Sequence, residues 1–309
     1  MLALADLMHL VRPTPRRVQE QRWADRVERY REVREAGPPK NTPDVARHQV
    51  GGLTWYVPHP DLGLGRLMAR SQQLPAIFEI EQSHRLGARG DTMIDIGANI
   101  GTTSIPRVKM GHFRRAYVAE PEQLDYTCLV HNVVANSAQG LVLPDNCAIY
   151  SFSGSVKFRE QAQSGVHRVN LKDKGRDVPC FTLDDWVQRC GVDLRRLHFI
   201  KCDAQGAEGH IFRGAESLLT LRRVLWQIEY WPRGLSALGT TEAELQALVA
   251  SWFSDFAILG RRGDGKNVET VRPIGELGPA ITALQLGARG FTNLLLYPTS
   301  LAAIRGLGT

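Results

Sequence analysis

Four acidic residues follow short apolar segments of the chain, and each could take part in binding or proton transfer at the end of a buried strand. They are Asp95, Glu120, Asp203 and Glu229. Short, largely apolar runs are typical of strands in a parallel sheet that is covered on both faces. In an open α/β sheet, ligands bind in the crevice outside the carboxyl ends of the strands. We therefore predict that the four carboxylates converge on one edge of the sheet.

A glycine-containing turn directly follows the first of these acids. The predicted strand 92–96 runs through Gly97, Ala98, Asn99 and Gly101 into a helix that should begin near residue 102 or 103. Glycines let the backbone pass close to a ligand, and the free N–H groups of the first helical turn would face the same crevice. These four residues are candidate binding residues, although a turn of this kind is also common in α/β proteins where it binds nothing.

The second acid narrows the choice of ligand. Glu120, followed by Pro121, ends the predicted strand 115–119, where an acid can accept hydrogen bonds from both hydroxyls of a ribose. The glycine spacing is G-x-x-x-G and lacks the third glycine of a dinucleotide site, so no pyrophosphate cradle is implied. A nucleoside ligand without a pyrophosphate fits better, and S-adenosylmethionine is the obvious candidate. Cys147 and Ala148, at the end of the third strand region, are expected to flank its adenine ring.

Two further segments extend this pattern along the chain. DIGANIG at 95–101 and the Glu-Pro pair are followed by IKCDAQGAE at 200–208 and by Gly-Ala at 214–215. Together they resemble the FkbM family of S-adenosylmethionine-dependent methyltransferases over about residues 79–297. The first motif is shared by many class I methyltransferases, and the second is more specific to FkbM-like proteins. The resemblance implies a Rossmann-like α/β fold, with a seven-stranded, mostly parallel sheet and helices on both faces.

Methyl transfer to a hydroxyl group needs a base that takes the proton of the acceptor. Asp203 is the first candidate for this base, or for orienting the amino group of the cofactor. His210 and Glu229 come next: imidazole titrates near neutral pH, but a histidine one turn into a helix is more often structural. The family pattern usually has an acid where this chain has Gln205. That departure removes a charge beside the site, and no metal is expected there.

A helix predicted at 74–86 precedes the first core strand. In class I methyltransferases the segment before that strand often covers the substrate, so the resemblance makes Glu79, Glu81 and His84 second-rank site candidates. For Glu81, ordinary surface charge is the simpler interpretation.

Composition sets broad limits on compartment and partners. The formal charge of +6 comes from 38 basic and 32 acidic residues, which permits an anionic partner without requiring one. The five cysteines form no CxxC pair and no His/Cys cluster, so they indicate free thiols in a reducing compartment. No apolar run reaches the ~18 residues of a membrane span, and no basic segment precedes the apolar start as in a signal peptide. We expect a cytoplasmic protein.

The chain divides into three predicted regions. Residues 1–40 form an N-terminal helical extension, which could pack against a second subunit in a homodimer. Residues 41–90 form a β-hairpin and the helix before the core, and residues 91–300 form the catalytic domain. Within this domain, short alternating segments at 154–182 predict an antiparallel insertion that could wall the substrate site. Four residues would make that wall basic: His167, Arg168, Lys172 and Arg176.

The leading hypothesis is O-methylation of a hydroxyl group on a sugar or secondary metabolite, with a small molecule or glycan as acceptor. The basic excess suggests an RNA methyltransferase as an alternative. However, the sequence shows neither an aromatic-rich basic stripe nor a recognisable RNA-binding module, so a nucleic-acid partner is not expected. The second alternative is a catalytically silent scaffold that keeps the fold, because Gln205 replaces an acid.

Overall fold

The computed structural model describes residues 45–59, 63–71, 73–74, 76–159, 168–169, 175–260, 270–286 and 290–298, with isolated positions between 21 and 35. The predicted N-terminal extension and its proposed packing on a second subunit lie outside these residues, apart from the isolated positions. His167 and Lys172 also lie outside them.

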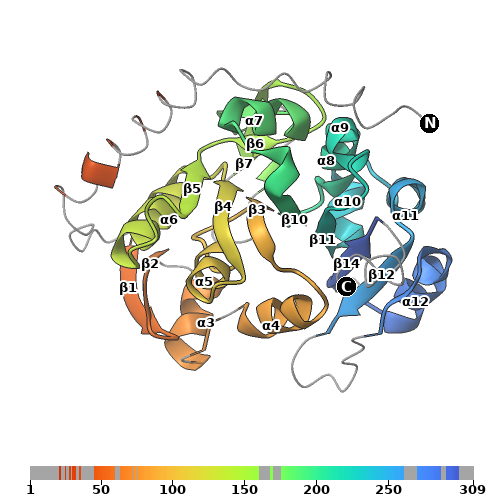
Figure 1. Ribbon diagram of the computed structural model, residues 1–309, viewed down its shortest axis with the longest axis horizontal. Coiled ribbons are helices and arrows are strands. Elements are labelled where there is room, and N and C mark those ends of the chain that lie inside the picture. The colour runs from red at the N-terminus through yellow and green to blue at the C-terminus, as the bar shows by residue number, and fades with distance from the viewer. Residues whose placement is uncertain are drawn as a thin grey trace.

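An eight-stranded sheet forms the centre of the molecule (Figure 1), in the order β13-β12-β14-β11-β10-β3-β4-β5. The strands β3, β4, β5, β10 and β11 are parallel, and β14 runs antiparallel to both β11 and β12. The predicted mostly parallel sheet of seven strands is confirmed, and the two-residue strand β13 adds an eighth at the edge. The bounds are β3 Gly90–Ile96, β4 Phe113–Ala119, β5 Val142–Asp145, β10 Leu197–Cys202, β11 Leu225–Tyr230, β12 Asp255–Leu259, β13 Arg272–Pro273 and β14 Thr292–Tyr297.

Helices cover both faces of this sheet, which gives the three layers of an α/β fold. Successive side chains of a strand point to opposite faces, so Ile94 packs in one hydrophobic cluster and Met93 in the other. The helices of the core are α5 Ser104–Lys109, α6 Gln123–Ala135, α7 Leu183–Cys190, α8 Glu208–Arg213, α9 Glu216–Leu219, α10 Pro232–Ala237, α11 Glu242–Trp252 and α12 Leu277–Leu284, with 3₁₀ turns at Leu194–Arg196 and Ile274–Glu276. None of the helices in the described residues combines the length and apolar character of a membrane-crossing helix.

A hairpin and two helices precede the core. The strands β1 Val45–Val50 and β2 Leu53–Pro58 pair antiparallel, and α4 spans Ile77–Arg85. The sequence predicts a single helix between the hairpin and the core, but the chain also forms the helix α3, Leu64–Ser71. The hydrophobic side of α3 explains this difference, since Met68 is fully buried against the core.

The hairpin is fixed to α6 by two asparagines. Asn132 accepts a hydrogen bond from the backbone N–H of Tyr56 at 2.6 Å and donates to its carbonyl at 3.1 Å. Asn136 makes the same pair of bonds with Thr54, at 2.9 and 2.7 Å. The pattern at the end of this helix suggests capping amides, and Asn136 does donate to the carbonyl of Asn132. Their larger role is to pair with β2.

A smaller sheet lies beside the main one, with the order β6-β9-β7-β8. Its strands are β6 Ala148–Ile149, β7 Gly154–Arg159, β8 Arg168–Val169 and β9 Arg176–Phe181. The pairs β7–β8 and β7–β9 are antiparallel, whereas β6 and β9 are parallel. The predicted insertion thus packs onto the core through β6, just after the third strand of the main sheet.

Candidate active site

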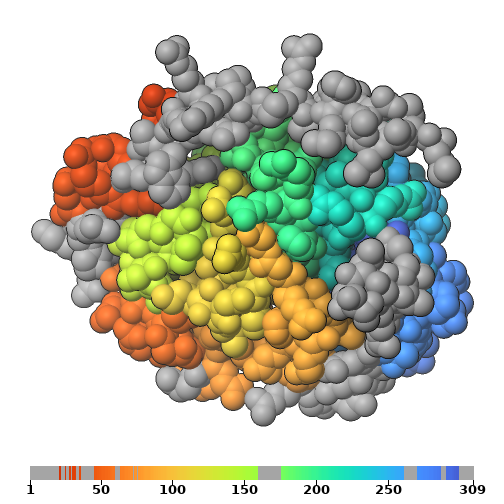
Figure 2. All heavy atoms as spheres, in the orientation of Figure 1, coloured from red at the N-terminus to blue at the C-terminus, as the bar shows by residue number. Residues whose placement is uncertain are grey.

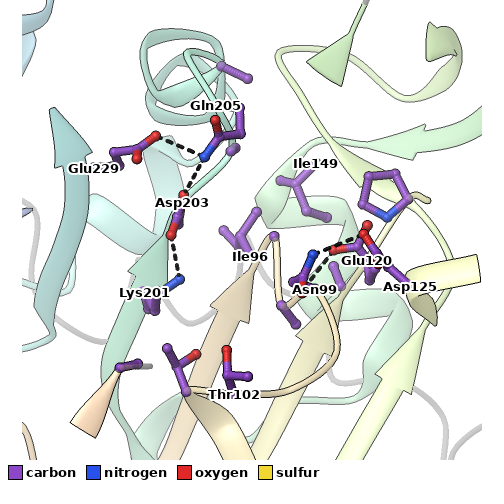
Figure 3. Close-up of a pocket in the computed structure, with 18 of the residues that line it drawn as sticks. Ile96, Asn99, Thr102, Glu120, Asp125, Ile149, Lys201, Asp203, Gln205 and Glu229 are labelled. Carbon is purple, nitrogen blue, oxygen red and sulfur yellow. Dashed lines mark hydrogen bonds and ion pairs between the residues drawn. The ribbon is translucent and has the colours of Figure 1, made fainter. Parts of the chain in front are cut away.

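A pocket of about 500 Å³ opens at the carboxyl ends of β3, β4, β10 and β11. Its size falls within the usual range of small-molecule sites. Three of the four acids named from the sequence line it: Glu120, Asp203 and Glu229. Figure 3 shows two groups of polar side chains facing each other across this pocket, one around Glu120 and one from Lys201 to Glu229.

The glycine turn forms the floor between these groups. Gly97 has a left-handed φ of 73°, and a Cβ atom there would lie 1.9 Å from the carbonyl oxygen of Asp203. Only glycine therefore lets β3 and the loop after β10 approach so closely. The N–H groups of Gly97 and Ala98 both donate to the carbonyl of Ala119, at 3.0 and 3.1 Å. The turn is thereby held across the end of β4.

Glu120 is held by backbone groups on both of its carboxylate oxygens. Its Oε2 accepts from the N–H of Asn99 at 2.7 Å, and its Oε1 accepts from the N–H of Glu122 at 2.8 Å. Burial, followed by the nearby Asp125, raises the pKa of Glu120, and the two backbone hydrogen bonds oppose this shift. The carboxylate is therefore oriented before any ligand binds, at the position predicted for a ribose.

The predicted adenine-binding residues lie on the same side of the pocket. Cys147 and Ala148 both line it, together with Ile149 and with Pro121, which was predicted only as a cofactor-binding residue. This wall is mostly apolar, as the face of a nucleobase requires.

Asp95 and Gly101 were predicted to contact the ligand, but neither lines the pocket. Asp95 is fully buried, accepts a hydrogen bond from the hydroxyl of Thr103 at 2.5 Å and pairs with the ammonium of Lys201 at 3.5 Å. Adjacent residues of a strand point to opposite faces, and Ile96 instead lines the pocket. A Cβ atom at Gly101 would lie 2.8 Å from Ile105. Both residues support the wall from behind.

A connected set of polar side chains forms the opposite wall (Figure 3). The ammonium of Lys201 lies 3.2 Å from Oδ2 of Asp203. The amide nitrogen of Gln205 donates to Oδ1 of Asp203 and to Oε2 of Glu229, at 3.1 Å each. Gln205 thus bridges the two acids.

The charges on this wall shift one another. Although burial opposes it, the carboxylates of Asp203, Asp95 and Glu79 raise the pKa of Lys201, so Lys201 stays a cation. Burial, followed by Asp203, raises the pKa of Glu229. Carboxyl groups with raised pKa values in a cleft are typical of catalytic sites.

Glu208 supports this wall from below. It is fully buried, and its Oε1 accepts a hydrogen bond from the N–H of Ala204 at 2.8 Å. Burial raises its pKa to about 7. The helix dipole alone explains an acid at this place in the sequence, but in the structure it also closes the loop that carries Asp203.

Glu79 reaches the pocket from α4, outside the core sheet. Its Oε2 accepts from the amide of Asn293 at 2.9 Å, and its Oε1 accepts from the amide of Gln227. Burial raises the pKa of Glu79. The other two candidates on α4 do not line the pocket. Glu81 is exposed, and the ring of His84 stacks on that of His112.

His210 lies away from the pocket, contrary to its prediction as a catalytic residue. Its Nε2 lies 2.8 Å from the carbonyl of Leu238, and its ring stacks on Tyr150 at a centroid distance of 4.3 Å. Burial lowers its pKa. Its place on α8 turns the ring toward this packing contact and not toward the pocket.

The insertion was predicted to form a basic wall of the pocket, but its described residues add no basic side chain to the lining. Arg176 does not line the pocket and donates to the carbonyl of Pro121 at 2.9 Å. The described part of the insertion contributes the apolar Phe158 to the lining. Among the described lining residues, Lys201 is the only basic one.

Sequence reasoning missed three polar residues that build the site: Lys201, Gln227 and Asn293. A lysine inside the apolar strand β10 is a signal in itself, because a buried ammonium group needs carboxylate partners. The amides of Gln227 and Asn293 carry no local signal, because their partner Glu79 is far away in the sequence.

Part of the chain is similar to a known protein family. Residues 95–237 match the family described as Methyltransferase FkbM domain. No curated protein matches the chain. A crystal structure of the methyltransferase FkbM from Methylobacillus flagellatus shares 17% identity, covers 67% of this chain and 44% of its own, and has a TM-score of 0.43. This chain therefore spans less than half of that protein.

Two other solved structures are similar at lower identity. The m1A22 tRNA methyltransferase TrmK of B. subtilis shares 9% identity, covering 72% of this chain and 67% of its own, with a TM-score of 0.40. TYW2 of M. jannaschii, solved in complex with S-adenosylmethionine, shares 11% identity, covering 84% and 87%, with a TM-score of 0.37.

Proposed function

Since residues 95–237 form an FkbM methyltransferase domain, we propose that the protein transfers a methyl group from S-adenosylmethionine to a hydroxyl group of a sugar or secondary metabolite. The observation that carries the proposal is the carboxylate of Glu120, oriented by two backbone N–H groups at the mouth of a 500 Å³ pocket. An acid held in this way can accept both hydroxyls of a ribose.

The residues present fit this donor. Gly97 leaves room where a side chain would collide with the loop after β10. The apolar residues Ala148 and Ile149 suit an adenine ring, and the carboxylates of the pocket suit a cation. When bound, S-adenosylmethionine supplies a methyl group on a positively charged sulfur. The protein has to hold the acceptor in line with it and take away a proton.

Glu229 is the best placed base, with Asp203 as a positioning residue. Both oxygens of Asp203 already accept from side chains, one from Lys201 and one from Gln205. Glu229 accepts from Gln205 through Oε2, and burial raises its pKa. A raised pKa makes a carboxylate a stronger base near neutral pH.

The two alternatives receive less support. Gln205 was the reason to consider a silent scaffold, yet its amide holds both acids in the pocket. An RNA methyltransferase needs basic contacts to phosphates, whereas the described pocket contains five lining acids and a single lysine.

Calorimetric titration with S-adenosylhomocysteine tests donor binding, and transfer of a labelled methyl group to a panel of sugars and metabolites tests the reaction. Binding in a 1:1 ratio is expected. Failure of a folded sample to bind would remove the proposal.

Glu229→Gln tests the assignment of the base. It should lower kcat by about 10²–10⁴-fold and leave the affinity for S-adenosylhomocysteine within about threefold. The matched control is Glu81→Gln, which changes an exposed acid of α4. If Glu229→Gln were as active as the control, Glu229 would not be the base.

A further inference from the structure

The pocket has two halves that differ in composition. One half contains the glycine turn, Glu120 and the apolar wall after β5. The other half, called the acceptor half below, is defined by its lining residues: a polar floor of Glu79, Lys201, Asp203, Gln205, Glu229 and Asn293, and an apolar rim of Leu64, Leu67, Trp231 and Phe291. Figure 3 shows Lys201, Asp203, Gln205 and Glu229 on the side opposite Glu120. If the donor binds at Glu120, as proposed above, the acceptor binds in this second half.

The floor of the acceptor half is rich in carboxylates. Glu79, Asp203 and Glu229 line it, against the single ammonium group of Lys201. That ammonium is already paired with Asp203 at 3.2 Å and with the buried Asp95 at 3.5 Å. Arg107, a second cation near Glu79, is fully buried and does not line the pocket. A carboxylate or phosphate on the acceptor would add a further negative charge beside Asp203 and would hold the protons of Glu79 and Glu229, whose pKa values burial already raises. The described lining offers it no cation other than the paired Lys201. Hydroxyl and ammonium groups donate hydrogen bonds, and ionised carboxylates only accept them.

The rim of the acceptor half is apolar and open. Leu67 on α3 is 46% exposed and Phe291 before β14 is 36% exposed, and both line the pocket. Large apolar side chains that remain exposed beside a cleft are typical of a ligand surface. An apolar group of a ligand in this pocket can pack against these side chains.

We propose that the acceptor is an apolar molecule that presents a hydroxyl or amino group to the acidic floor and carries no anionic group beside it. This inference rests on the proposed function for the direction of binding. It narrows the acceptor from a sugar or secondary metabolite to an apolar metabolite whose body contacts Leu67 and Phe291. Sugars, carboxylic acids and nucleic acids are then excluded.

Three probes share a phenyl ring on a four-carbon chain and differ in the terminal group: 4-phenylbutan-1-ol, 4-phenylbutylamine and 4-phenylbutyrate. Their affinities are measured by ligand-observed NMR, with the protein alone and saturated with S-adenosylhomocysteine. The alcohol and the amine should bind at least tenfold more tightly than the carboxylate. Butan-1-ol, which lacks the ring, should bind more weakly than 4-phenylbutan-1-ol. Equal binding of the carboxylate, or no binding of any probe, overturns the proposal.

Two variants locate the effect. Glu79→Gln keeps a side chain of the same shape and should reduce the penalty against 4-phenylbutyrate at least threefold, whereas Glu81→Gln on the same helix should not. Leu67→Ser should weaken the alcohol and the amine alike, by at least threefold. If neither variant changes these affinities, the probes bind elsewhere and the inference fails.

The outcome separates this inference from the proposed function. If S-adenosylhomocysteine does not bind but the protein alone prefers the alcohol and the amine over the carboxylate, the donor assignment fails and the chemistry of the acceptor half stands. If S-adenosylhomocysteine binds and the order of the probes is reversed, the donor assignment stands and this inference is wrong.

Discussion

The two sides of the pocket hold their acids by different means. On the side of the glycine turn, called the donor side after the proposed function, the carboxylate of Glu120 accepts from the backbone N–H groups of Asn99 and Glu122. On the other side, which is the acceptor half of the proposal and is called the acceptor side below, the carboxylates of Asp203, Glu229 and Glu79 are held by side chains from β10, β11 and β14 and from the loop after β10. Backbone donors remain when a side chain is replaced, whereas side-chain donors do not. The donor side is therefore a fixed property of the fold, and single substitutions can alter the acceptor side.

The largest effect should come from removing the cation of the acceptor side. Lys201→Met leaves Asp95 buried without its ion pair, and breaking a buried pair in this way typically costs about 3–5 kcal/mol. Urea unfolding at pH 7 should show a loss of this size. The double variant Lys201→Met with Asp95→Asn should regain most of it, because neither charge is then left alone. Equal stability of the single and double variants would show that the pair does not hold this wall together.

The next effect concerns the donor side. Glu120→Ala removes a carboxylate that accepts hydrogen bonds from the glycine turn and from the start of α6. Among the contacts described, it is the only side chain of the donor side that does so. We expect affinity for S-adenosylhomocysteine to fall about 100-fold, which is about 2.7 kcal/mol. Calorimetry measures this, with Glu81→Ala as the exposed control. A loss below threefold would mean that the ribose does not lie at Glu120.

The contribution of Glu208, below the acceptor side, to the stability of the fold should depend on pH. Burial raises the pKa of Glu208 to about 7, from an ordinary value of 4.5. The folded protein thus holds this proton more tightly than the unfolded chain does. The contribution of Glu208 to stability is fully present below about pH 4.5 and is lost as the pH rises toward 7.

Glu208→Gln has no such proton to lose. Relative to the wild type, its free energy of unfolding should rise by about 3 kcal/mol between pH 4.5 and pH 8. Thermal or urea unfolding of both proteins at the two pH values measures this difference. A constant difference across this range would show that Glu208 titrates normally in the folded state.

The smallest effect should come from removing the amide of Gln205. Gln205→Ala removes the amide that joins Asp203 to Glu229 but leaves both acids in place. We expect about a tenfold drop in kcat, equal to about 1.4 kcal/mol, and affinity for S-adenosylhomocysteine within threefold of wild type. Gln205→Asn is the conservative comparison. A drop in donor affinity larger than the drop in kcat would show that the two sides are not independent.

The same contrast explains what could be predicted from the sequence. Gly97, Asn99 and Glu120 lie within a short stretch, and their contacts follow from a strand, a turn and a helix in succession. The motif therefore brings Gly97, Asn99 and Glu120 together in the lining of one pocket. Asp95 lies in the same stretch but does not line the pocket, because the pattern does not tell which of two adjacent strand residues faces the crevice.

The acceptor side depends on contacts between distant parts of the chain. Glu79 meets Gln227 and Asn293, which follow it by 148 and 214 positions. No periodicity or local spacing encodes such a meeting. His210 illustrates the opposite error: its residue type suits proton transfer, but the packing of α8 against Tyr150 decides where the ring points.

The amides that α6 presents to the hairpin also bear on self-association of the protein. Asn132 and Asn136 are four residues apart on a helix, about 6 Å along its axis, and Thr54 and Tyr56 are two apart on a strand, about 6.6 Å. The matching repeats let two side chains complete the ladder that a third strand would otherwise supply. This border of β2 is thereby closed to strand addition, the usual route to unwanted self-association of exposed sheet margins.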